Sequence, residues 1–137
     1  MIIRTAAYNT LSGSSNLTGI VGTRIHWVLM PQGTIYPAVT FETLPTSGRV
    51  HLMGADSVLA METLRVTVWG ETKDFTNMET AAGYIKTLLQ DFTGTMGGAG
   101  GITVERIFLE TNQPTMFNAG VGVYQISQDF EVWYQEA

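Results

Sequence analysis

The feature that most constrains this fold is a strand pattern that runs almost directly into a helix pattern. Residues 64–69 read Leu-Arg-Val-Thr-Val-Trp, an apolar–polar alternation typical of a half-buried β-strand. Between Asp74 and Phe92 the apolar residues step by three and four positions and form one stripe on a helix. That stripe consists of Phe75, Met78, Ala82, Ile85, Leu89 and Phe92. We expect the strand and the helix to pack together, because each has one apolar face to bury.

Four further segments show strand patterns, and the first is Arg24-Ile25-His26-Trp27-Val28. Residues 36–43 alternate after Pro37, which cannot donate a ladder hydrogen bond and so belongs at the start of a strand or on an edge. Residues 102–111 alternate with a slip at 105–106, which predicts a β-bulge. Residues 123–134 form the last predicted strand, with Tyr, Ile, Phe and Val sharing one face.

An N-terminal helical segment and two irregular stretches complete the pattern. Residues 2–11 carry apolar side chains at helical spacing. The stretch 49–61 fits either a hairpin arm or a long loop, and the glycine-rich stretch 95–101 reads as a flexible connector. We therefore predict one domain over residues 1–137 of the α+β class. In it, a mostly antiparallel sheet of four or five strands packs on one long helix, with a short N-terminal helical segment.

Charge and cysteine content argue against several function classes. The net charge is −5, and the seven basic residues are scattered without a linear basic patch. Because nucleic-acid affinity depends on neutralising phosphates, we expect no specific DNA or RNA binding. The chain has no cysteine, which excludes disulfides and Cys-ligated metals. No apolar run approaches the ~18 residues of a membrane span, so we expect no membrane partner.

The low charge leaves two readings open. Charged residues make up 14% of the chain, against roughly 25% in typical soluble domains. The chain is either a small Gly- and Thr-rich β protein or one whose surface is covered by other subunits, since interface cores are depleted in charge. Trp69 and Trp133 fall on strand faces opposite the apolar stripes. Either a second layer or a partner protein covers them, and we favour the partner because exposed tryptophans are common interface anchors.

Catalytic chemistry finds little support in the residues. His26 and His51 are the histidines, and neither has metal-ligand spacing; His26 reads best as a packed or edge side chain in a strand. The glycines of 97–101 follow a helix pattern rather than opening one, and no Lys-Ser or Lys-Thr completes a phosphate loop. The Gly-x-Ser-x-Gly nucleophile motif is absent. We predict no enzymatic activity, no cofactor and no metal site.

The order of segments resembles one family of viral proteins. The matching segments are Gly22-Thr23-Arg24-Ile25-His26, Pro31-Gln32-Gly33, Tyr36-Pro37-Ala38-Val39-Thr40-Phe41, Leu64-Arg65-Val66-Thr67-Val68-Trp69-Gly70-Glu71-Thr72, Ile85-Lys86-Thr87-Leu88-Leu89 and Asp129-Phe130-Glu131-Val132-Trp133-Tyr134. In these the chain resembles the tail-completion or tail-terminator (head–tail joining) proteins of bacteriophages with long non-contractile tails. The resemblance covers nearly the whole chain as a pattern of strands and turns.

This resemblance implies a structural role in the virion. Such proteins form a homohexameric ring at the head-proximal end of the tail tube, end its polymerisation and present a surface to the head connector or stopper protein. The implied partners are further copies of the chain, the tail tube protein and the connector, and DNA passes through the lumen without being gripped. The implied location is the neck region of the tail, after assembly in the bacterial host cytoplasm.

The resemblance also directs attention to two loops as contacts. Sheet edges and long loops supply the patches of a heterologous ring interface. We expect contacts from 47–61, through Arg49, His51, Leu52 and Met53, and from 112–120, through Met116 and Phe117.

Two alternative functions stay open. The first is a head-side stopper or adaptor protein of the neck. The second is a small cytoplasmic module with a ligand pocket between the sheet and the helix.

Overall fold

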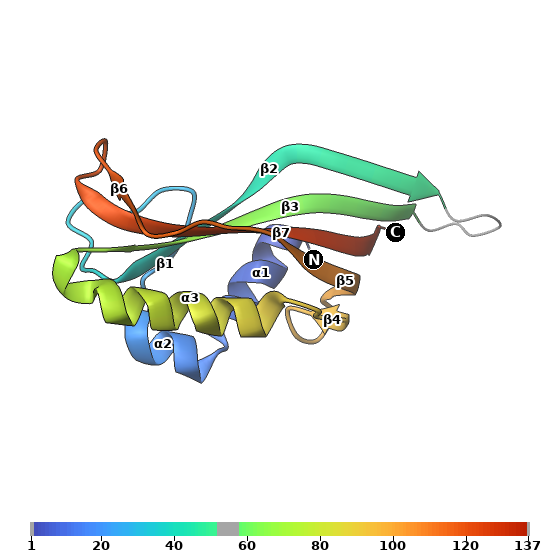
Figure 1. Ribbon diagram of the computed structural model, residues 1–137. Coiled ribbons are helices and arrows are strands. Elements are labelled where there is room, and N and C mark those ends of the chain that lie inside the picture. Colours follow the sequence, from blue (N-terminus) through green and yellow to red (C-terminus); the bar gives the residue numbers. More distant parts are fainter. Residues whose placement is uncertain (1, 52–57, 137) are drawn as a thin grey trace.

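Seven strands form one curled sheet in the computed structural model, which describes residues 2–51 and 58–136 (Figure 1). The strands are β1 (Ile25–Trp27), β2 (Ala38–His51), β3 (Val58–Gly70), β4 (Gly94–Met96), β5 (Ile102–Asn112), β6 (Met116–Asn118) and β7 (Val123–Glu136). Their order is β1-β2-β3-β7-β5-β4, and β6 pairs with β7 next to the end of β5. β1 runs parallel to β2, and the remaining pairs are antiparallel.

Helices cover one face of this sheet. They are α1 (Ile3–Ser12), α2 (Ser15–Val21), the 3-10 turn η1 (Thr72–Asp74) and α3 (Phe75–Leu89). Figure 1 shows α1, α2 and α3 on the same side of the sheet. α3 lies against β3 and β7, and α2 packs beside α3. Among the described residues, the opposite face of the sheet carries no helix.

The predicted helix after strand 64–69 is present but ends earlier than expected. Its N-terminus follows a capping box in which the Asp74 carboxylate accepts from the Glu71 backbone N–H at 2.9 Å. α3 then ends at Leu89, because Gln90 is extended and Asp91 has a φ of 62°. A left-handed residue cannot continue a right-handed helix, so Phe92 lies outside α3.

The hydrophobic core fills the space between the sheet and the helices. The apolar positions of the alternating segments in β3 and β7 point into it, as the sequence predicts. The α3 stripe does the same, with Met78, Ile85 and Leu89 fully buried. The two N-terminal helices contribute Ala6, Ala7, Leu11, Leu17 and Val21, each fully buried.

The predicted architecture of the fold is wrong. We expected four or five mostly antiparallel strands on one long helix, with a short N-terminal helical segment, whereas the described residues form seven strands in a mixed sheet covered by three short α-helices. The N-terminal helix is present as α1, and the strand predicted over residues 24–28 is present as β1. β4 and β6 have three residues each, too few to show an alternation. The parallel pairing of β1 with β2 is a tertiary choice that no local pattern encodes. β4 occupies part of the stretch after α3 that we read as a connector.

The stretch 49–61 belongs to two long strands where it is described. Arg49 pairs with Ala60 and His51 pairs with Val58, so the hairpin-arm reading is confirmed there. β3 continues its pairing with β7 out to Val58 and Glu136. The arm is therefore a three-stranded extension of the sheet rather than a free loop.

Candidate contact surfaces

The helix-free face of the sheet carries a polar network at its centre. Arg65 on β3 donates to both carboxylate oxygens of Asp129 on β7, at 2.8 and 3.0 Å. This hydrogen bond is the main cause that raises the pKa of Arg65, and the charges of Asp129 and Glu42 add to it. The hydroxyls of Thr67 and Ser127 lie 3.1 Å apart, and both residues are buried. These polar groups therefore satisfy one another within the chain.

The two predicted contact tryptophans share this face but lie far apart. Trp133 pairs with Met61, and eight positions of β3 separate Met61 from Trp69, about 27 Å at ~3.4 Å per residue. Each indole is half-buried and donates within the chain: Trp69 to Thr40 Oγ1 at 2.8 Å, Trp133 to Glu131 Oε1 at 2.6 Å. The structure therefore does not bring them into one site, and their role as partner contacts stays a prediction.

The first predicted contact stretch, 47–61, includes the paired ends of β2 and β3. Arg49 and His51 are on the outer part of β2. Leu52 and Met53 lie outside the described residues. Their contact role stays a prediction.

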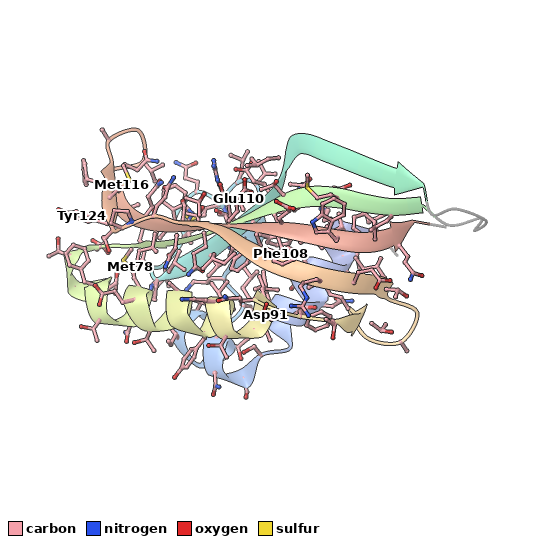
Figure 2. All side chains as sticks on the ribbon, turned by 45° about the vertical axis from the view of Figure 1, so that its right-hand side comes forward. Met78, Asp91, Phe108, Glu110, Met116 and Tyr124 are labelled. Atoms are coloured by element: carbon pink, nitrogen blue, oxygen red, sulfur yellow. The ribbon has the colours of Figure 1, made fainter. Side chains whose placement is uncertain are left out.

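The second predicted loop contains strand β6. Met116 and Phe117 are 49% and 57% exposed, and as strand neighbours they point to opposite faces. The Phe117 ring lies 5.1 Å from the Tyr124 ring, which lies 4.7 Å from Phe75 at the start of α3. Met116 pairs with Gln125 of β7 and points to the opposite face of the sheet from Phe117. In Figure 2, Met116 lies above Tyr124.

Sequence reasoning missed a pocket at the outer side of β1. Its volume is about 420 Å³; α1 and the residue before it supply Arg4, Tyr8 and Ile2, and β1 supplies His26 and Trp27. The guanidinium carbon of Arg4 lies 5.2 Å from the centre of the Trp27 ring, a cation–π contact. Among the described residues that line it there is no carboxylate. The helical spacing of residues 2–11 could have indicated part of this pocket, since it places Arg4 and Tyr8 on one side of α1.

Sequence reasoning also missed an exposed apolar residue on β5. Phe108 is 47% exposed, whereas Ile107 beside it is fully buried. Figure 2 shows Phe108 and Glu110 along the same strand. The predicted bulge at 105–106 is confirmed as a register shift between Val104 and Arg106. The sequence could have shown that Phe108 is exposed, because strand neighbours point to opposite faces. With Ile107 in the core, Phe108 must point outward.

Within the described residues, no group of three or more His, Cys, Asp or Glu is placed to hold a metal ion. No helix in the same part of the chain is both long and apolar enough to cross a membrane.

Sheet edges and exposed apolar side chains are the kinds of surface that suit contacts with other proteins. Both are present here, for example the edge strand β1 and the exposed Phe108.

Comparison with protein families decides the class of this chain. The family model described as "Tail completion protein gp17" matches residues 5–135. The chain belongs to this tail completion family. The family is one of structural phage virion proteins, so the chain is a structural component of a phage-type tail or neck.

A solved structure agrees on the fold. A chain of the "Virion of native gene transfer agent (GTA) particle" superimposes with a TM-score of 0.72 at 13% sequence identity, covering 98% of this chain and 95% of that chain. At this identity the likeness concerns the fold alone. Comparison with curated proteins gives no match for the sequence. For a tail completion protein, the exposed sheet edges now become the surfaces of greatest interest.

Proposed function

We propose that this chain forms a homohexameric ring at the head-proximal end of a tail tube. The ring ends polymerisation of the tube protein and offers its other side to the head connector or stopper protein. DNA passes through its lumen without specific binding. The observation that carries the proposal is the tail completion family match over residues 5–135.

Features of the fold support a role in assembly. A sheet backed by three helices is a rigid body with a single core, which suits a part that works by shape. Exposed large apolar side chains lie at both sides of the sheet, for example Leu29 after β1 and Phe108 on β5. Two different exposed surfaces on one chain are what a heterologous ring interface requires. The net charge of −5 also disfavours adhesion of DNA to a lumen formed by several copies.

The test is to assemble tails with and without this chain. Without it we expect tubes of uncontrolled length that do not join heads, measured by negative-stain electron microscopy. Adding the purified chain should restore a narrow length distribution, whereas the heat-unfolded chain should not. Normal tails joined to heads in its absence would overturn the proposal. Recovery of the chain on tailless heads, and not on headless tails, would identify it as a head-side stopper or adaptor instead.

A further inference from the structure

Charge is divided unevenly along the chain and across the fold. Residues 1–41 contain Arg4 and Arg24 and no Asp or Glu, whereas residues 102–137 contain five acidic residues and a single basic one, Arg106. The first segment forms α1, α2 and β1, and the second forms β5, β6 and β7. β1 ends the strand order on one side, and β5 is followed only by the short β4 on the other. The basic segment therefore reaches one side of the sheet, and the β5 part of the acidic segment, with Glu105 and Glu110, reaches the other, while β7 lies between them.

The basic side is also apolar and exposed. We define the β1 surface as Ile2, Arg4, Tyr8, His26, Leu29 and Ile35. His26 links its two parts, because it lines both the pocket shared with α1 and a second pocket shared with Ile35, and the Leu29 N–H donates to the carbonyl of Trp27 on β1. Ile2, Leu29 and Ile35 are 65%, 77% and 69% exposed. Large apolar side chains this exposed on one surface mark an interaction site.

The backbone and the arginines of this side reinforce that reading. Val28, next to β1, has a φ of 66°, a conformation that β-branched residues rarely adopt. Arg24 donates to the backbone carbonyls of Ile20 and Pro37 rather than to a carboxylate. Arg4 contacts an aromatic ring instead of an acid. The β1 surface thus keeps a net positive charge beside its apolar residues.

The opposite side combines apolar exposure with negative charge. We define the β5 surface as Phe108, Glu110 and Thr111, which are neighbours on one strand. Phe108 is 47% exposed, and Glu110 and Thr111 are exposed as well. Arg106, the basic residue of this region, is offset by Asp91 at 3.7 Å. Within the described residues, β5 pairs on its outer side with β4 through residues 102–104, and the Asp91 N–H donates to the Ile107 carbonyl at 2.9 Å, so the open part of that edge begins after Ile107.

We propose that the β1 surface of one copy binds the β5 surface of the next copy, with Arg4 facing Glu110. This inference rests on the proposed ring function and specifies the contact that closes it. Opposite charges set the register of the contact, and the apolar residues of both surfaces are buried in it. The contact is heterologous, so it leads to a ring when the rotation closes. The sheet is curled rather than flat (Figure 1), which is compatible with successive copies turning around an axis.

Cysteine cross-linking tests this contact directly, because the natural chain has no cysteine. Thr5 lines the pocket on the β1 surface, and Thr111 is exposed on β5 next to Glu110. The double variant Thr5→Cys/Thr111→Cys, treated with a short bismaleimide on capped tubes, should give a ladder of cross-linked copies on a denaturing gel. The matched control Thr5→Cys/Thr76→Cys places the second cysteine on the exposed side of α3 and should give no ladder.

Charge reversal supplies a second, independent measurement. Arg4→Glu and Glu110→Arg should each reduce the fraction of capped tubes by about tenfold, because each places like charges across the contact. Combining the two reversals should restore capping to near the natural level. Lys86→Glu and Glu79→Arg on the exposed side of α3 are the matched controls and should leave capping unchanged.

The outcomes separate this inference from the proposed function. If the natural chain does not cap tubes, the ring function itself fails. If it caps tubes but the Thr5/Thr111 variant gives no ladder, the ring stands and this contact is wrong. Cross-linked dimers from either single-cysteine variant would show like surfaces meeting, which also overturns it. Single charge reversals that cap tubes normally would do the same.

Discussion

Two glycines of this chain, Gly70 and Gly83, lie in opposite packing environments. Gly70 ends β3 where the strand meets η1 and α3, and a Cβ there would lie 2.5 Å from the Met78 sulfur and 2.9 Å from the Asp74 Cβ. Gly83 lies in the middle of α3, and a Cβ there would meet nothing within 4 Å. Gly70 therefore permits the close strand–helix approach, whereas Gly83 only adds flexibility to the unfolded chain.

We expect Gly70→Ala and Gly83→Ala to change stability in opposite directions. Gly70→Ala should lower the free energy of unfolding by about 1–3 kcal/mol, because the methyl group overpacks the junction. Gly83→Ala should raise it by about 0.5–1 kcal/mol, since alanine has the higher helix propensity. Urea unfolding followed by circular dichroism measures both. A neutral Gly70→Ala would mean that Met78 moves aside at little cost.

At the scale of elements, the β6–β7 hairpin depends on one side chain. The Asn118 amide donates to Gln125 Oε1 at 2.9 Å, and its carbonyl oxygen accepts from the backbone N–H of Gly120 and Val121 at 3.0 and 3.2 Å. β6 has three residues and pairs with β7 alone among the described strands. The hairpin is therefore a candidate for local opening without loss of the core.

Replacing Asn118 should loosen this hairpin and nothing else. In Asn118→Ala we expect amide hydrogens of residues 116–125 to exchange about tenfold faster, the effect of losing ~1.4 kcal/mol of local stability. Exchange in the middle of β3 should stay unchanged, because its partners β2 and β7 keep their ladders. Hydrogen exchange read by mass spectrometry separates the two regions. Equally faster exchange in the hairpin and in β3 would show that the hairpin opens only when the whole domain unfolds.

At the scale of the whole molecule, shape and charge act together. The strand order carries the basic N-terminal segment to one side of the curled sheet and the β5 part of the acidic C-terminal segment towards the other. The polar centre of the helix-free face is satisfied internally by the Arg65–Asp129 pair. Contacts between copies are therefore expected at the sides of the sheet rather than at its centre.

Salt should weaken the association of copies. Screening shortens the range of charge interactions from about 10 Å at 0.1 M salt to about 3 Å at 1 M. We expect less capping of tubes at the higher concentration, counted by electron microscopy. In the variant Arg4→Gln/Glu110→Gln the loss of capping with added salt should be smaller, because the pair at positions 4 and 110 no longer carries charge. Association that strengthens with salt would indicate a contact dominated by apolar burial.

The sequence by itself determined the long elements of this protein. Strands around 64–69 and 123–134 and the stripe of α3 were predictable, because alternation and helical spacing are local properties of the chain. The bulge at 105–106 was predictable for the same reason, since it interrupts a local alternation. The family also followed from the order of these segments, as the match over residues 5–135 shows.

Only the tertiary structure decided the architecture and the candidate surfaces. Three-residue strands carry no periodicity, so their places in the sheet come from the partners they pair with. Arg4 and His26 share a pocket although 22 positions separate them. Phe108 of β5 and the residues of β6 lie along the same strand, because β5 and β6 both pair with β7. Such neighbours are set by strand order and sheet curvature, which arise from packing the whole core and leave no trace in any one segment.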